Sequence, residues 1–218
     1  FDENIYLDHN GNKISSIDIA TEIFKHLKEN CDNYLKNKIY DCVLTVPAYF
    51  DEKARSGIMR SAFMSGFNVK RLINEPTAAA FAYGLEKNKR GTYFVFDLGG
   101  GTFDVSILKL SEGIFKVIGS GGDSKLGGDD FDKFFAMKIV KDFFNETFSE
   151  IPIKEQIFIL NKCKILKEKI NDKEYFDEIF IVNQASKNIK ITSDFFNSAV
   201  DSLIDKTIEI SNSLLSEC

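Results

Sequence analysis

Hydrophobic positions recur at three- and four-residue spacing over residues 16–34, which is the period of one face of an α-helix. Ser16 stands at the start of this run and is a residue type that caps helices. The pattern therefore predicts an amphipathic helix with one apolar stripe facing a core. The stripe consists of Ala20, Phe24, Leu27, Cys31 and Tyr34.

Extended and helical patterns then alternate. An apolar run predicts a buried strand over 40–46, and Asp51 is placed to cap a helix that follows it. A second strand is predicted over 69–73, and Pro76 suits the first position of the alanine-rich helix after it. Strands and helices in this order predict an α/β fold.

The pattern changes after the charged segment 85–91, which we expect to be a loop or hinge. Extended runs follow at 93–98, 103–110 and 114–119. The connections between them are too short for a crossover helix, so the three strands are predicted to form an antiparallel meander.

The remaining chain is predicted to be mainly helical, with one hairpin. Helices are predicted over 129–144, 153–169 and 193–216, the last capped by Ser193, and a hairpin pairs 175–182 with 187–191. A short hairpin around Asn10-Gly11 is predicted over 4–13.

Composition and charge argue against several classes of function. The 218 residues are 44% hydrophobic, enough for a core, and carry a net charge of −5. Proteins that track nucleic-acid phosphates normally show a basic face, so we expect no nucleic-acid partner. No apolar run approaches the roughly 20 residues that cross a bilayer, and the N-terminus does not resemble a signal peptide. We expect a soluble, cytoplasmic protein without a membrane partner.

The four cysteines are scattered along the chain and include no Cys-x-x-Cys pair, so we expect reduced thiols. Cys31 and Cys163 fall on predicted helix faces. At such positions a small buried hydrophobic side chain is favoured over a redox or metal role.

The strongest chemical signal is Asp-Leu-Gly-Gly-Gly-Thr-Phe-Asp at 97–104, the first turn of the predicted meander. Its glycines leave backbone N–H groups bare at a tight turn, which can wrap a phosphate. Asp97 and Asp104 would repel such a ligand, so their presence argues for a bridging Mg²⁺ or monovalent cation and a positioned water. Taken alone, the segment fits a plain glycine-rich hairpin with solvated acids about equally well.

A second glycine pair, Gly127-Gly128, opens a predicted helix. Free amides at a helix N-terminus also attract phosphate, so two phosphate sites are predicted on the two sides of a small sheet. The sequence holds neither Gly-x-x-x-x-Gly-Lys-[Ser/Thr] nor Gly-x-Gly-x-x-Gly. A P-loop enzyme and a dinucleotide-binding fold are therefore not indicated.

Four segments resemble the seventy-kilodalton heat-shock chaperones, the DnaK-like family, in order and spacing. They are Val-Pro-Ala-Tyr-Phe at 46–50, Ile-Asn-Glu-Pro-Thr-Ala-Ala-Ala at 73–80, the segment 97–104, and Leu-Gly-Gly-Asp-Asp-Phe-Asp at 126–132. The resemblance runs from about residue 16 to the end and is carried beyond 132 mainly by helix pattern. It implies part of an actin-like ATPase fold (ribonuclease H-like) that binds ATP or ADP with Mg²⁺ and K⁺.

The resemblance also implies how the chain divides. The implied parts are 1–15 as the end of the upper subdomain of lobe I, 16–90 as part of its lower subdomain, 91–128 as the lower subdomain of lobe II, 129–192 as its helical upper subdomain, and 193–218 as a return helix to lobe II.

Individual residues match functional positions of the family. Asp97, Glu75 and Thr102 are implied as catalytic, the two acids organising Mg²⁺ and the hydrolytic water, and Asp104 as a cation-binding acid. The nucleotide is implied to meet Gly99, Gly100, Gly101, Thr102, Gly128 and Asp129. Pro47 and Arg55, together with Glu75, match a set that couples nucleotide state to the substrate domain. Arg71 and Asn74 lie where a J-domain cochaperone and the interdomain linker dock, although an ordinary surface position suits Arg71 as well.

The helix 153–169 departs from the family pattern. Lys164, Lys167, Glu168 and Asn171 stand where the family grips adenosine through glutamate, lysine, arginine and serine, so only the lysine is kept. Lysine has no acceptor for a ribose hydroxyl, and we expect weaker adenosine binding. Loss of the acid resembles the HscA branch, which serves iron–sulfur cluster assembly. A degenerate helix in an ordinary DnaK-like chain is the alternative that stays open.

Three functions compete: a chaperone ATPase, a small-metabolite kinase of the same superfold, and a non-hydrolysing actin-like assembly protein. Fold alone does not choose between them, and the segments 46–50 and 74–77 favour the chaperone. The implied partners are a J-domain cochaperone, a nucleotide exchange factor and client polypeptides held by a C-terminal domain, with a monomeric chain. The sequence does not begin with methionine, and we expect a piece of a longer protein that alone binds ATP poorly and hydrolyses little.

Overall fold

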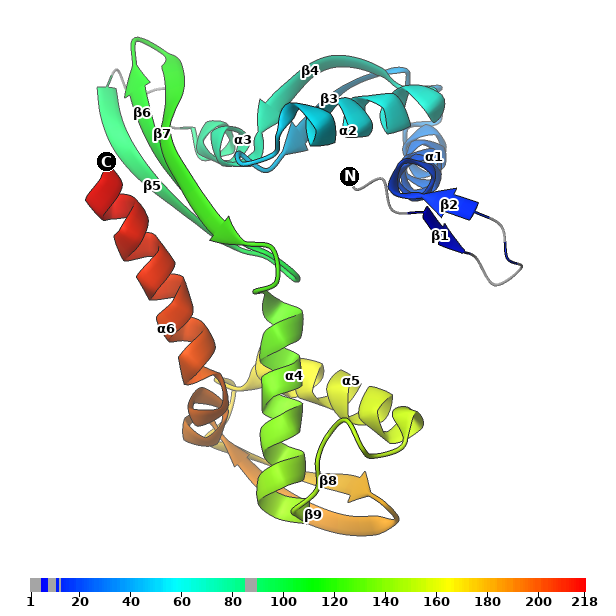
Figure 1. Ribbon diagram of the computed structural model, residues 1–218, viewed down its shortest axis with the longest axis vertical. Coiled ribbons are helices and arrows are strands. Elements are labelled where there is room, and N and C mark those ends of the chain that lie inside the picture. The colour runs from blue at the N-terminus through cyan, green and yellow to red at the C-terminus, as the bar shows by residue number, and fades with distance from the viewer. Residues whose placement is uncertain (1–4, 8–10, 12, 85–89) are drawn as a thin grey trace. The chain divides into compact units, whose positions relative to one another are not determined.

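The computed structural model describes residues 5–7, 11, 13–84 and 90–218 of the chain. The elements are β1 (Ile5–Leu7), β2 (Lys13–Ser15), α1 (Ser16–Leu35), β3 (Asp41–Val46), α2 (Glu52–Met64), β4 (Asn68–Asn74), α3 (Glu75–Ala82), β5 (Arg90–Leu98), β6 (Phe103–Ser111), β7 (Ile114–Asp123), α4 (Gly128–Ile139), the π-helix η2 (Val140–Phe144), α5 (Ile153–Lys169), β8 (Tyr175–Val182), β9 (Ala185–Thr192) and α6 (Ser193–Glu217), as Figure 1 shows. The predicted mixture of helices and strands is confirmed.

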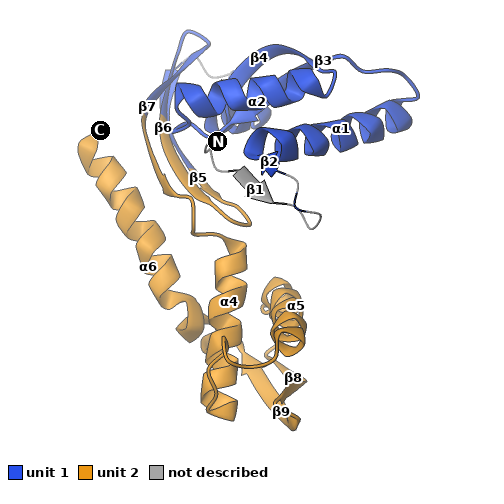
Figure 2. Cartoon of the chain, turned by 45° about the vertical axis from the view of Figure 1, so that its right-hand side comes forward, with its two compact units in different colours: residues 1–95, 108–118 blue, residues 96–107, 119–218 orange. Residues whose placement is uncertain are grey.

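The chain forms two compact units, coloured separately in Figure 2. Unit 1 comprises Phe1–Val95 and Leu108–Ile118, and unit 2 comprises Phe96–Ile107 and Gly119–Cys218.

In unit 1, β3 and β4 are parallel neighbours joined through α2, which confirms the predicted strand–helix–strand unit. Val46, the buried last residue of β3, pairs with Asn74 at the end of β4. Asp51 caps α2 as predicted, because its Oδ1 accepts a 2.8 Å hydrogen bond from the amide of Ala54. The carboxyl ends of both strands therefore lead directly into the segments that begin α2 and α3.

The strands β5, β6 and β7 form a three-stranded sheet in that order. Four residues connect β5 to β6 and two connect β6 to β7, which leaves room only for tight turns and confirms the predicted meander. The first strand begins at Arg90, earlier than predicted. Most of the predicted hinge, residues 85–89, lies outside the described residues.

Unit 2 packs α4, α5, α6 and the antiparallel β8–β9 hairpin around one core. Phe135 of α4 is fully buried and meets Phe196 of α6 edge to face, with ring centroids 5.1 Å apart. The predicted helix 129–144 is interrupted: α4 ends at Ile139, and a π-helical turn follows it, closed by Asn145 in the left-handed conformation (φ 55°).

Two helix caps lie one residue earlier than predicted. Ser15, not Ser16, caps α1 in a reciprocal arrangement with Asp18, whose carboxylate accepts from the Ser15 amide at 2.9 Å. Likewise Thr192, not Ser193, caps α6 and accepts from the amide of Phe195 at 3.2 Å. At both places two cap-type residues are adjacent, and the hydrogen bond to the third residue of the helix selects the earlier one.

The predicted core-facing stripe of α1 is wrong over the second half of the helix. Leu27 is 48% exposed, Tyr34 is 86% exposed and Cys31 is exposed, whereas Thr21 is buried. Thr21 tolerates burial because its hydroxyl donates to the carbonyl of Ile17 at 2.7 Å. Burial of Cys163 is confirmed.

The predicted hairpin at the start is present as the antiparallel pair β1–β2, with Gly11 at a positive φ of 81°. Asn10 of that turn lies outside the described residues.

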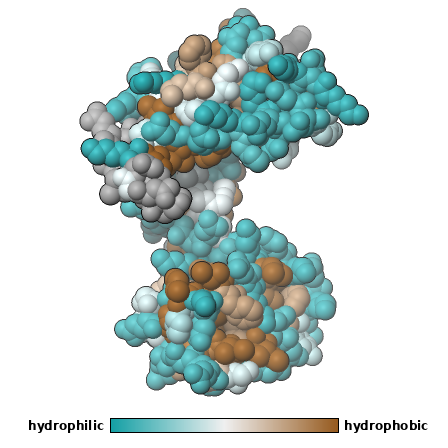
Figure 3. Space-filling model, turned by 90° about the vertical axis from the view of Figure 1, so that its right-hand side faces the viewer, coloured by the Kyte–Doolittle hydropathy of each residue, from teal (hydrophilic) through white to brown (hydrophobic). Residues whose placement is uncertain are grey.

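None of the helices within the described ranges is long and apolar enough to cross a bilayer. In Figure 3, apolar side chains gather in patches on the face shown, separated by polar ones. Exposed apolar residues of unit 2 include Ile153, Ile157 and Phe158 of α5 and Ile179 and Ile181 of β8.

Candidate functional site

The glycine turn, residues 99–102, joins β5 to β6. It closes on itself through a 2.9 Å hydrogen bond from the Gly99 amide to the carbonyl of Thr102. A Cβ atom built on Gly100 or Gly101 would meet nothing within 4 Å. Both residues are exposed, so the outer side of the turn is open to a ligand that approaches the backbone.

The first turn of α4 holds the inner side of the glycine turn. The amide of Gly128 donates to the carbonyl of Gly99 at 2.9 Å, and the amide of Asp129 donates to the carbonyl of Gly100 at 2.8 Å. Gly127 comes so close that a Cβ there would lie 2.5 Å from both the Gly100 oxygen and the Gly101 nitrogen. Only glycine fits at 127 without displacing backbone.

These contacts fix the direction of the amides on the other side. In a planar trans peptide the C=O and N–H groups point in opposite directions, and no cis peptide bond occurs among the described residues. Since the carbonyls of Gly99 and Gly100 face α4, the amides of Gly100 and Gly101 face away from it. Neither amide donates to any group in the described part of the chain.

The expectation of a second phosphate site with free amides at the start of α4 is wrong. The amides of Gly128 and Asp129 are taken by the glycine turn, and that of Asp130 donates to the Gly127 carbonyl at 2.9 Å. The Gly127 amide itself donates to Oδ2 of Asp130 at 3.0 Å. The two glycine segments therefore form one structure with a single set of outward amides. A nucleotide contact by Gly128 or Asp129 through other atoms stays a prediction.

The two acids of the segment differ in environment. Asp97 at the end of β5 is exposed, whereas Oδ1 of Asp104 on β6 is buried and has no hydrogen-bond partner among the described residues. Burial raises the pKa of the Asp104 carboxyl; a hydrogen bond from Thr102 lowers it, and the nearby charge of Asp97 raises it further.

A buried carboxylate oxygen without a hydrogen-bond partner, such as Oδ1 of Asp104, is suited to bind a cation. A monovalent or divalent ion beside Asp104 would satisfy its buried oxygen and offset the repulsion from Asp97. Over the ranges that the structure describes, however, no cluster of three or more histidine, cysteine or acidic side chains is gathered to enclose a metal. The chain thus offers part of a coordination shell, which water and a bound phosphate would have to complete.

One residue of α5 reaches the site. The Nζ of Lys167 donates to the carbonyl of Gly128 at 2.7 Å and lies 2.8 Å from Oδ1 of Asp132. Lys164 and Asn171, predicted beside it, are exposed, and within the described ranges no hydrogen bond or ion pair joins them to the glycine turn.

Sequence reasoning missed Asp132 as a functional residue. It is only 5% exposed, and burial raises the pKa of its carboxyl, although the ammonium of Lys167 lowers it. Its position among the buried positions of α4, between Phe131 and Phe135, was an available signal, because an acid on an apolar helix face needs a partner.

The remaining predicted residues belong to unit 1. Arg55 of α2 donates from Nε to the carbonyl of Phe50 at 2.9 Å, and from Nη2 to that of Ala48 at 3.3 Å and to Oδ1 of Asn74 at 2.8 Å. Half-buried Pro47 follows β3, half-buried Glu75 begins α3, and Arg71 is exposed on β4. The structure thus brings Arg55 and Asn74 together, and the roles of this group stay predictions.

Comparisons with a protein-family model and with curated proteins both find similarity to Hsp70-type chaperones. A protein-family model described as Hsp70 protein matches residues 2–218. A relative named chaperone protein HscA homolog, from Rickettsia prowazekii, is 42% identical over 205 residues, covering 94% of this chain and 32% of the relative. The chaperone protein HscA of Buchnera aphidicola subsp. Schizaphis graminum is 41% identical over 216 residues, covering 99% of this chain and 34% of the relative. The chain spans about a third of the length of the curated relatives it matches.

Proposed function

The chain belongs to the Hsp70 family, and we propose that it forms part of the ATP-binding and ATP-hydrolysing domain of a molecular chaperone. The observation that carries the proposal is the pair of outward amides of Gly100 and Gly101, on a turn whose carbonyls are tied to α4. Fixed, unpaired N–H groups on an open surface suit the oxygens of a phosphate chain. No reorganisation of the turn is needed to present them, which favours binding.

The acids give this site its proposed chemistry. We propose that Asp97 and Asp104 hold Mg²⁺ and K⁺, which when bound neutralise phosphate charge. Asp97 is exposed at the edge of the turn and is free to accept a hydrogen bond from water, while Asp104 offers its buried oxygen to a cation. Thr102 partly offsets the effect of burial by lowering the pKa of the Asp104 carboxyl, which favours its charged form.

Membership of the family favours the chaperone over the kinase and the assembly protein. Several relatives are named chaperone protein HscA, and we propose the same branch for this chain, with a role in iron–sulfur cluster assembly. The proposed setting is a cytoplasmic, monomeric protein that couples ATP hydrolysis to client binding. Its proposed partners are a J-domain cochaperone, a nucleotide exchange factor and the client polypeptide.

A side chain on the glycine turn tests the nucleotide site. Gly101→Val adds bulk where a Cβ meets no protein atom, so the fold should be unaffected while ATP binding is lost. Gly121→Ala is the matched control, because its Cβ would make only ordinary contacts at 3.7 Å with Ile210 and Val105. Calorimetry with ATP and thermal melting would be measured for both variants and for the parent, each as the intact protein. Undiminished ATP binding by Gly101→Val would refute the proposed site.

The chaperone reading is tested in the intact protein. We expect ATP to release a bound unfolded or scaffold-derived peptide and expect no phosphate transfer to small metabolites. Release that does not depend on ATP would contradict the chaperone function, and metabolite phosphorylation would support the kinase instead. We further propose that the 218-residue chain alone binds ATP weakly and hydrolyses little, because it spans about a third of its relatives. Micromolar binding of ATP by the isolated chain, measured by calorimetry, would overturn this.

A further inference from the structure

Lys167 lies at the start of a hydrogen-bond chain that ends at the glycine turn. Its Nζ donates to the carbonyl of Gly128 at 2.7 Å. The other end of that same peptide group, the amide of Asp129, donates to the carbonyl of Gly100 at 2.8 Å. The peptide between Gly100 and Gly101 then ends in the outward amide of Gly101.

The direction of every bond in this chain is the same. A cation at the carbonyl of a peptide makes its N–H group a stronger donor, and aligned hydrogen bonds polarise one another in sequence. The charge of Lys167 therefore strengthens the bond from Asp129 to Gly100, and that bond strengthens the Gly101 amide as a donor to an anion. The lysine acts through two peptide groups without touching the ligand.

Asp132 keeps Lys167 in this place. Its Oδ1 lies 2.8 Å from the lysine Nζ as an ion pair and has no other partner among the described residues. Asp132 is on α4 and Lys167 is on α5, so the pair also joins these two helices. Because the carboxylate is buried, it exposes little of itself to any alternative partner, and the ammonium is held where it meets the Gly128 carbonyl.

We propose that Lys167 and Asp132 are positioning residues of the glycine turn: Lys167 fixes and polarises the peptides that present the Gly101 amide, and Asp132 holds Lys167 at the Gly128 carbonyl. The inference rests on the proposed function, in which this turn binds the phosphates of a nucleotide. It assigns to Lys167 an effect on phosphate groups, in addition to the contact with adenosine implied by the family resemblance.

The effect of Lys167 on phosphate groups is separated from its contact with adenosine by comparing the affinities for ADP and adenosine. Both are measured in the intact protein by competition against a fluorescent ATP analogue. Lys167→Met should weaken ADP roughly tenfold more than it weakens adenosine, as expected for loss of a charge-assisted contact, because loss of a direct contact with adenosine would weaken both ligands alike. Lys167→Arg, which retains the charge, should recover part of the ADP affinity. Equal weakening of ADP and adenosine, or no weakening of either, would overturn the inference. Failure of the parent protein to bind ADP would instead refute the proposed function.

Lys167→Met leaves a buried carboxylate without its partner and is expected to destabilise the fold. The double variant Asp132→Asn/Lys167→Met removes both charges, so its melting temperature should return toward that of the parent while ADP remains weak. Recovery of ADP affinity together with stability would show a merely structural role and would overturn the inference.

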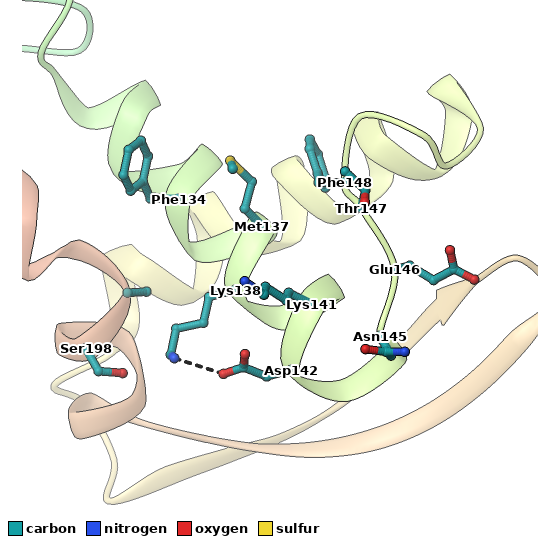
Figure 4. A pocket seen from close by; sticks show the side chains of 11 residues that line it. Phe134, Met137, Lys138, Lys141, Asp142, Asn145, Glu146, Thr147, Phe148 and Ser198 are labelled. Carbon is teal, nitrogen blue, oxygen red and sulfur yellow. Dashed lines mark ion pairs between the residues drawn. The ribbon is translucent and has the colours of Figure 1, made fainter.

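The control uses another lysine–aspartate pair on the same helical run. Lys138 of α4 and Asp142 of η2 are 2.8 Å apart in a separate hollow of about 610 Å³, where Figure 4 shows them paired beside Ser198. Asp142→Asn breaks this pair without touching the glycine segments. It should leave the affinities for ADP and adenosine unchanged, and a loss of ADP affinity equal to that of Lys167→Met would contradict the assignment.

Discussion

Nη2 of Arg55 donates a 2.8 Å hydrogen bond to Oδ1 of Asn74, the residue that precedes α3. Asn74 makes no side-chain cap bond to the helix, so this oxygen serves the guanidinium instead. The same guanidinium donates to the carbonyls of Phe50 and Ala48 after β3. Arg55 therefore ties the turn after β3 to the start of α3, where Glu75 is the first residue.

Replacing the planar, forked guanidinium of Arg55 by the single ammonium of lysine should destabilise unit 1. Lysine at position 55 has no rigid fork and cannot keep all three bonds, and we expect Arg55→Lys to lower the free energy of unfolding by about 1–2 kcal/mol. Urea unfolding measures the difference. Arg71→Lys, at an exposed position on β4, is the control and should change stability by less than about 0.5 kcal/mol. Equal stability of the two variants would show that the fork contributes nothing.

Local patterns predicted the elements well because each pattern is a property of neighbouring residues. The short connections after Leu98 and Ser111 sufficed to predict the meander. The stripe on α1 was misjudged because a period of 3.6 identifies one face of a helix but not how much of that face is buried, and Tyr34 on this stripe is 86% exposed.

Tertiary hydrogen bonds were beyond the reach of such patterns. The glycine turn was recognised from its own residues, but the bonds from Gly128 to Gly99 and from Asp129 to Gly100 join segments almost thirty residues apart. They decide which amides are free. Considering the two segments separately assigned free amides to both of them, whereas only the glycine turn presents them. The ion pair of Asp132 with Lys167 is hidden from local reasoning for the same reason.

The carboxylate of Asp32 should make the stability of unit 1 depend on pH. Its Oδ1 accepts from the amide of Ile39 at 2.7 Å and its Oδ2 from Lys28 at 2.9 Å. The Ile39 amide first, and then the Lys28 ammonium, hold the pKa of Asp32 below its ordinary value. A lowered folded-state pKa gives stability that is present above the ordinary pKa and is lost as the pH falls through the folded-state pKa.

We therefore expect Asp32→Asn to melt below the parent at neutral pH and to approach it as the pH falls below the ordinary pKa of an aspartate. Melting temperatures across this range measure the gap between the two proteins. A gap of constant size at every pH would show that the charge of Asp32 is not its cause.

Because of Asp104, potassium ions should raise the melting temperature of the protein. A cation that satisfies its buried Oδ1 stabilises the folded state by mass action, and potassium chloride should raise the melting temperature more than tetramethylammonium chloride of equal ionic strength. Asp104→Asn should abolish the difference. Asp123→Asn is the control, since Lys206 already pairs with that carboxylate, and it should keep the potassium response. Loss of the response in both variants would place the cation elsewhere.

Gly127→Ala tests whether α4 anchors the glycine turn. A methyl group at 127 would lie 2.5 Å from backbone atoms of Gly100 and Gly101, and backbone has no flexible end that can yield. We expect a loss of about 1–3 kcal/mol in the free energy of unfolding without any ligand, as for other overpacked sites. Gly121→Ala, with contacts at 3.7 Å, should be close to neutral in the same measurement.

Nucleotide affinity should fall together with that stability, because a displaced α4 no longer aims the amides of Gly100 and Gly101. Were Gly127 instead an open cradle for phosphate, the ligand-free protein would lose no stability and only binding would suffer. The free energy of unfolding of the ligand-free Gly127→Ala variant, compared with its affinity for ADP, therefore decides between two roles for residue 127. It either packs against the glycine turn or contacts the phosphate directly. Because Gly127 approaches the backbone of Gly100 so closely, we expect the first role, in which residue 127 packs against the glycine turn.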